Sequence, residues 1–101
     1  MQDTAQLFVE EHGSKAVAKI KKEVVKIMKH PQKASAKEDA ECVLHKMKIL
    51  HQKLMERLKS LPPGAKTANY CSYEFAAALE SQLYSAIDIP SLYHALHAEE
   101  S

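Results

Sequence analysis

Apolar residues recur at helical spacing through most of the chain, and this pattern predicts a protein built from α-helices. The clearest example covers residues 15–29, where apolar side chains repeat every three or four positions and share one side of a helix. They are Val17, Ile20, Val24, Ile27 and Met28. Five lysines take the opposite side: Lys15, Lys19, Lys22, Lys26 and Lys29. Pro31 is expected to end this helix, because proline disfavours helical geometry in the residue before it.

Breakers and caps between the apolar repeats predict four further helices. Their expected ranges are residues 4–12, 36–60, 72–86 and 90–97. Gly13 is expected to separate the first helix from the second, and Pro62 with the residues that follow it ends the long helix. Ser35 and Glu38 have the spacing of a capping box, in which each side chain bonds the backbone amide of the other.

No segment of the chain alternates apolar and polar residues with β-branched side chains, as a β-strand would. The sequence therefore predicts a single all-α domain over residues 1–101. Because the connections between helices are short, we expect a small bundle of three to four antiparallel helices. His51 lies in the apolar row of helix 36–60, and we expect it to be a hydrogen-bonded core residue.

The helix expected over residues 72–86 is apolar or amphipathic on nearly every side. Tyr73 and Tyr84 lie away from its main apolar row, and Tyr70 continues their line if the helix begins early. Two explanations are open. The other helices of the chain cover this helix on both sides, or the tyrosines contact another chain, since tyrosine is favoured at interfaces. Cys42 and Ile49, seven positions apart on the polar side of helix 36–60, indicate a second contact surface.

Composition is that of a globular protein, since hydrophobic residues make up 46% and charged residues 27% of the chain. No apolar run approaches the roughly 18 residues that cross a bilayer. The chain begins with an early acid and no basic segment, so we expect no secretion signal and a cytoplasmic location. In that reducing compartment Cys42 and Cys71 are expected to be free thiols.

Charge divides the chain into two unequal parts. All 14 lysines and arginines lie in residues 1–66 together with 8 of the 13 acidic residues, so this part carries a net charge of +6. Residues 67–101 hold five acids and no lysine or arginine. The two parts therefore either attract each other, within the fold or within a dimer, or the basic part forms a surface for an anionic partner.

Candidate catalytic and metal-binding groups are sparse. A zinc site needs three or four converging ligands, yet the pairs Glu41 with His45 and His94 with His97 gain no third ligand by local spacing. The chain has no glycine-rich phosphate loop and no Ser-His-Asp signature. We therefore expect no enzymatic activity, no cofactor and no metal.

These patterns favour a small regulatory or adaptor module that binds a protein partner and forms a homodimer. Tyr70, Tyr73 and Tyr84, with Cys42 and Ile49, are the expected partner contacts, and the five lysines of residues 15–29 are expected to orient an anionic partner. The alternative is DNA or RNA binding, in which the same lysines neutralise phosphates. Binding to a membrane surface is not expected, because residues 15–29 contain no Trp or Phe.

Overall fold

A computed structural model describes residues 4–62 and 73–98 of the chain, and all regular structure in these ranges is helical. The helices are α1 (Thr4–His12), α2 (Ser14–Lys29), α3 (Ala36–Ser60), α4 (Tyr73–Ile87) and α5 (Ile89–His97). Their bounds differ by at most one residue from the ranges that the sequence predicts. Tyr70 and Cys71 lie outside the described residues.

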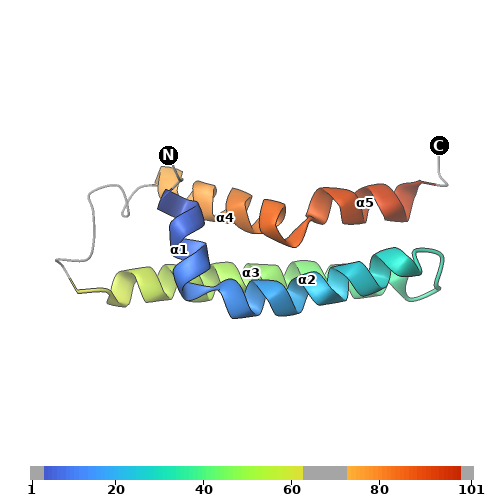
Figure 1. Ribbon diagram of the computed structural model, residues 1–101, viewed down its shortest axis with the longest axis horizontal. Coiled ribbons are helices and arrows are strands. Elements are labelled where there is room, and N and C mark those ends of the chain that lie inside the picture. Colours follow the sequence, from blue (N-terminus) through green and yellow to red (C-terminus); the bar gives the residue numbers. More distant parts are fainter. Residues whose placement is uncertain (1–3, 63–72, 99–101) are drawn as a thin grey trace.

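The helices form an elongated bundle of 50 × 21 × 20 Å (Figure 1). Helices α2 and α3 form an antiparallel hairpin, while α4 and α5 follow one another along that pair in the direction of α2. Helix α1 crosses the bundle instead of aligning with it. The all-α prediction is confirmed, but the expected three to four antiparallel helices are five in the described ranges. Two tight backbone bends separate α1 from α2 and α4 from α5.

The first bend lies at Gly13, where the sequence predicts a boundary. The Gly13 amide donates a 2.7 Å hydrogen bond to the Val9 carbonyl, and its own carbonyl accepts one of 2.9 Å from the amide of Val17. A Cβ atom on Gly13 would lie 3.3 Å from the Val9 oxygen and 3.4 Å from the Leu54 side chain. Glycine therefore lets this bend approach α3 closely.

The second bend lies at Asp88, which adopts the left-handed conformation with φ 67° and ψ 44°. Asp is one of the few residue types that reach this region at moderate cost. The bend ends α4 and starts α5 within one residue, and Pro90 lies in the first turn of α5, as expected. Ile87 and Ile89 on either side of the bend are both buried.

The predicted capping box at the start of α3 is wrong. Ser35 precedes the helix, but its φ and ψ of −88° and 1° continue the preceding turn rather than adopting the extended geometry that a capping side chain needs. Its hydroxyl donates instead to Asp39 Oδ2 at 3.2 Å. The Ala36 amide donates to the Lys33 carbonyl at 3.0 Å, so the turn itself takes up that amide.

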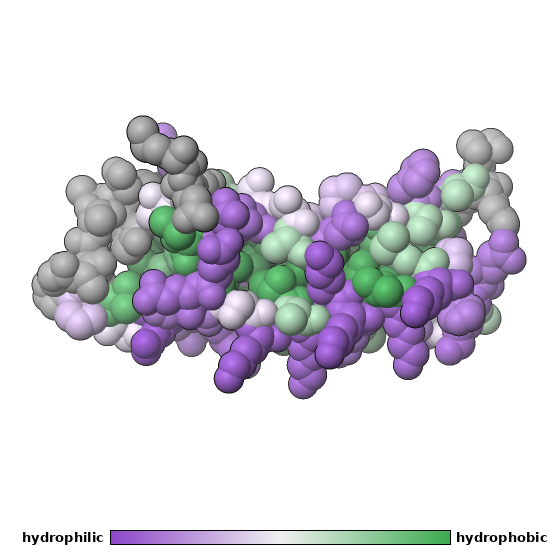
Figure 2. All heavy atoms as spheres, in the orientation of Figure 1, coloured by the Kyte–Doolittle hydropathy of each residue, from purple (hydrophilic) through white to green (hydrophobic). Residues whose placement is uncertain are grey.

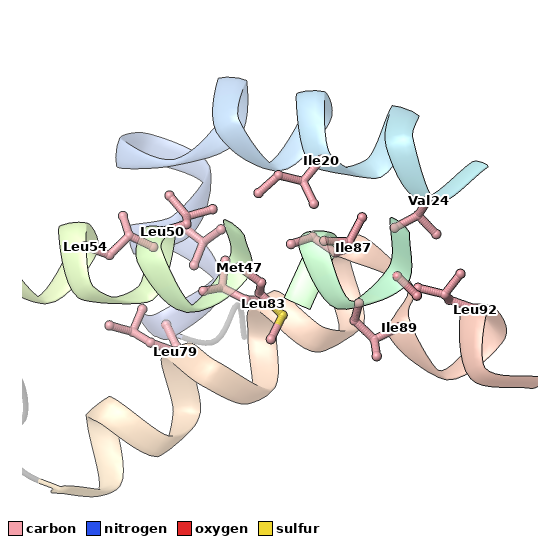
Figure 3. Packing of buried hydrophobic residues seen from close by; sticks show 14 of the residues in the cluster. Ile20, Val24, Met47, Leu50, Leu54, Leu79, Leu83, Ile87, Ile89 and Leu92 are labelled. Carbon is pink, nitrogen blue, oxygen red and sulfur yellow. The ribbon is translucent and has the colours of Figure 1, made fainter. Parts of the chain in front are cut away.

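One hydrophobic core runs through the bundle and joins all the helices (Figure 3). Helix α4 provides its central row and contacts each of the other four helices. Leu79, Leu83 and Ile87 on α4 are completely inaccessible to solvent. His51 lies at the edge of this core, half-buried, with Nε2 3.0 Å from the carbonyl oxygen of Ala76. The prediction that His51 is hydrogen-bonded is confirmed, and Nε2 is the donor because a carbonyl oxygen only accepts.

Candidate binding face on helices α2 and α3

The lysine ridge of α2 is the most distinctive surface of the described residues. It consists of Lys15, Lys19, Lys22, Lys26 and Lys29, and all five side chains are exposed. The opposite side of α2 buries Ile20, Val24 and Ile27 in the core, so packing fixes the direction in which the lysines point. The ridge extends over about 21 Å at 1.5 Å of rise per residue. In Figure 2 hydrophilic side chains gather along this edge of the molecule.

The ridge costs the free helix some stability. Lysines three or four positions apart on a helix repel one another by about 0.2–0.5 kcal/mol per pair. The first turn of α2 contains no acidic residue, while Lys26 and Lys29 lie in the last turn, where the helix dipole favours cations. The helix dipole thus offsets part of the charge repulsion at Lys26 and Lys29, but not at Lys15 at the other end of the helix. A carboxylate or phosphate group close to the ridge would relieve this repulsion.

No ion pair joins a ridge lysine to a carboxylate in residues 4–62 and 73–98. The acidic side chain of α2 itself, Glu23, binds Lys46 of α3 instead, with 2.6 Å between Oε1 and Nζ. This hydrogen bond is the main cause that raises the pKa of Lys46. In the described structure the positive charge of the ridge is therefore not cancelled by the acidic part of the chain.

A groove runs between α2 and α3 and contains two hollows. The larger, of about 470 Å³, is lined among others by Glu23, Lys26, Lys33, Asp39, Cys42 and Lys46. The smaller, of about 230 Å³, is lined among others by Lys19, Glu23, Lys46, Ile49, Leu50 and Lys53. We call the two hollows together the α2–α3 groove. The Glu23–Lys46 pair lines both hollows and so lies between them.

The groove brings together residues that the sequence assigned to separate surfaces. Cys42 is exposed in the larger hollow and Ile49, with 38% of its area exposed, lies in the smaller one. Ridge residues Lys26 and Lys19 line the same two hollows. Sequence reasoning did not single out Lys53, because a single lysine on a polar helix side has no distinctive spacing.

The expected tyrosine contacts do not form one surface among the described residues. Tyr73 is 95% exposed at the start of α4, whereas Tyr84 is half-buried and packs against the core. Helix α4 is thus covered largely by its own chain, which was one of the two explanations for its apolar sequence. Tyr93 on α5 is a further exposed aromatic, with its ring stacked 6.4 Å from that of His97.

Few groups in the described ranges suit metal binding or catalysis. No three His, Cys, Asp or Glu side chains come together there as potential metal ligands. His45, His94 and His97 are exposed on the surface. The buried part of the described structure contains no polar or charged residue.

The chain matches no protein-family model, no curated protein and no solved structure. None of the helices in the described ranges has the length and apolar character needed to cross a membrane.

Proposed function

We propose that this protein is a small non-enzymatic regulatory or adaptor module that binds an acidic protein partner through the lysine ridge and the adjoining α2–α3 groove. One observation carries the proposal: five exposed lysines lie in a row on one helix and no described carboxylate neutralises them. Complementary charge of this kind steers and orients a partner. It also explains why α2 retains a row of like charges that lowers its own stability.

Two features of the face favour a protein partner over a nucleic acid. Exposed apolar side chains are interleaved with the lysines: Val25, 44% exposed, on α2 and Ile49 on α3. The face also lacks aromatic residues on which bases stack and arginines that hold phosphates with two hydrogen bonds. A mixed apolar and cationic surface suits an acidic protein surface with apolar residues of its own.

Binding of DNA or RNA through the ridge is the second candidate, and the density of exposed cations favours it. Lysines at spacings of three and four along about 21 Å can follow a phosphate backbone. Nucleic-acid binding predicts that the protein is retained on a heparin or DNA column at about 50 mM salt and is released by about 200 mM salt. The acidic-protein reading predicts partner capture that survives nuclease treatment.

A pull-down from native lysate, with and without nuclease, tests the proposal. The bait is the wild-type protein or a variant in which Lys19, Lys22 and Lys26 are replaced by glutamate. We expect the wild type to capture an acidic protein in both lysates and the variant to lose it. A control variant with Lys48, Arg57 and Lys59 replaced by glutamate changes the net charge equally on α3, outside the residues that line the groove. Equal loss in both variants, or loss only after nuclease treatment, would contradict the proposal.

The oligomeric state is a separate prediction. We expect a homodimer, and of the tyrosines predicted as contacts Tyr73 is the one that is exposed among the described residues and can contribute to its interface. Sedimentation of the wild type and of Tyr73→Ala measures this directly. A wild-type protein that sediments as a monomer at micromolar concentration contradicts the expectation.

A further inference from the structure

We propose that the α2–α3 groove is the docking site for an acidic amphipathic helical segment of the partner. In this arrangement two apolar side chains of the segment enter the two hollows and its carboxylates pair with the lysines on the rims. The inference rests on the proposed function and adds to it the chemical class of the partner and its exact place of binding. Helices laid into apolar grooves are a recurrent mode of peptide recognition.

The floor of the groove is apolar. In the larger hollow it includes Ile27 and Val43, and in the smaller one Ile20 and Leu50. All four side chains belong to the core and are accessible only in small part, so the floor is held rigidly by the packing of α2 on α3. Ile49 stands at the edge of the smaller hollow, with enough exposed apolar area to contact a bound side chain. This floor gives an apolar residue a place that a phosphate backbone cannot use.

The rims of the groove are cationic on both sides. Its charged lining comprises five lysines, Lys19, Lys26, Lys33, Lys46 and Lys53, against the acids Glu23 and Asp39. Glu23 is bound to Lys46, and Asp39 accepts a hydrogen bond from Ser35. Lys19 and Lys26 on the α2 side and Lys53 on the α3 side are therefore left without an ion pair to a carboxylate of the described residues. A segment with carboxylates on both flanks of an apolar row complements this arrangement.

The spacing of the hollows sets the spacing of the apolar residues in the segment. Cys42 in the larger hollow and Ile49 in the smaller one are seven positions apart on α3, which corresponds to about 10.5 Å. Two side chains at positions i and i+7 of a helix lying along the groove are separated by the same distance. The Glu23–Lys46 pair between the hollows then faces the turn of the segment that separates these two side chains.

Fluorescence anisotropy with two designed peptides tests the docking site. The first probe is a dye-labelled 16-residue peptide of Glu, Ala and Leu with its leucines at positions i and i+7, and the second has the same composition in scrambled order. We expect the patterned peptide to bind at least about tenfold more tightly than the scrambled one. Equal binding, or no binding of the patterned peptide at about 1 mM, would overturn the inference.

A matched pair of double variants locates the site. The groove variant combines Ile49→Gln with Lys53→Glu, and the control combines Leu7→Gln on α1 with Lys48→Glu on α3, two exposed residues that line neither hollow. Both exchange an exposed aliphatic residue and an exposed lysine, so both are expected to fold, which circular dichroism checks. We expect the groove variant to weaken binding of the patterned peptide about tenfold and the control less than about threefold.

The outcomes separate this inference from the proposed function. If the control variant weakens peptide binding as much as the groove variant, the docking site is overturned. If only the ridge triple variant weakens peptide binding, the docking site is overturned while binding to the cationic face stands. If neither variant nor the ridge triple variant changes peptide binding, both proposals fail. If a 12-base-pair DNA duplex binds more tightly than the patterned peptide and no longer binds the ridge triple variant, the partner on the ridge is a nucleic acid and not an acidic segment.

Alkylation of Cys42 gives a second, site-specific measurement. Cys42 is exposed and lines the larger hollow, so a segment that fills this hollow shields its thiol. In a Cys71→Ser background we expect the patterned peptide at saturation to slow maleimide labelling of Cys42 about fivefold or more, and the scrambled peptide to have no effect. Unchanged labelling at saturation would overturn occupation of the larger hollow.

Discussion

Helices α2 and α4 have nearly the same length, 16 and 15 residues, and each buries one side in the same core. Their outer sides differ completely. Helix α2 carries the lysine ridge outward, whereas the exposed positions of α4 hold two acids, Glu74 and Glu80, among small neutral residues such as Ala77, Ser81 and Ser85. Burial of one side is sufficient to place a helix, so the two outer sides were free to differ. The lysine ridge is therefore not needed to place α2 in the fold.

The two helices also differ in how the rest of the molecule depends on them. Helix α4 contacts each of the other four helices, and its buried row is completely inaccessible from Leu79 to Ile87. Helix α2 gives up stability on its outer side through repulsion between like charges. Changes inside α4 should therefore affect folding alone, and changes on the ridge should affect binding while leaving folding intact or improved.

The largest expected effect comes from Leu83→Ala in α4. Leu83 is completely buried, and removal of a buried leucine side chain typically destabilises a protein by about 2–5 kcal/mol through lost burial and the cavity left behind. Urea unfolding followed by circular dichroism measures the change. A loss below about 1 kcal/mol would show that α4 is not the centre of the core.

The bend that ends α4 provides the next effect. Asp88 has positive φ, so we compare Asp88→Gly with Asp88→Ala, two variants that both remove the carboxylate. We expect the glycine variant to be about 1 kcal/mol more stable than the alanine variant, because only alanine has a Cβ that is strained in the left-handed region. Thermal unfolding of the two variants gives the difference, and equal stability would mean that the bend is not as described.

A smaller effect of opposite sign is expected on the ridge. Lys22→Glu replaces repulsion with Lys19 and Lys26 by attraction, and should stabilise the protein by about 0.5 kcal/mol at low salt. The control Lys48→Glu on α3 has no charged Lys, Arg, Asp or Glu neighbour at helical spacing and should change stability less. Urea unfolding at about 20 mM and 500 mM salt checks both. A stabilisation that persists at high salt would contradict the electrostatic explanation.

The smallest effect concerns the ion pair between the two helices that form the groove. Because the bond to Glu23 raises the pKa of Lys46 above its ordinary value of 10.5, the pair contributes its stability in full below that value. The contribution is lost as the pH rises through the raised pKa of the folded protein. We expect the stability difference between wild type and Lys46→Met to be constant from pH 7 to about 10 and to decline only as the pH rises through the raised pKa of Lys46. A stability difference that changes between pH 7 and 9 would show that the titration of a group other than Lys46 causes it.

Helix positions were predictable because they depend on local patterns. The breakers Gly13 and Pro31 and the apolar period of residues 15–29 are properties of short segments, and they also place the lysine ridge on the exposed side of α2. The capping box at Ser35 failed because its geometry depends on the preceding turn. The expected three to four antiparallel helices were wrong because the range of a helix does not show whether that helix, here α1, aligns with its neighbours or crosses them.

The sequence by itself determined the helical segments and the exposed row of cations, since a period of 3.6 residues assigns every position to a side of its helix. Only the tertiary structure decided which sides meet. The Glu23–Lys46 bond joins residues 23 positions apart and the contact of His51 with Ala76 joins residues 25 apart. Packing between helices also brought Ile49 and Lys19 to the same hollow and turned Tyr84 toward the core. Such pairings depend on how whole helices pack, and no local period encodes that.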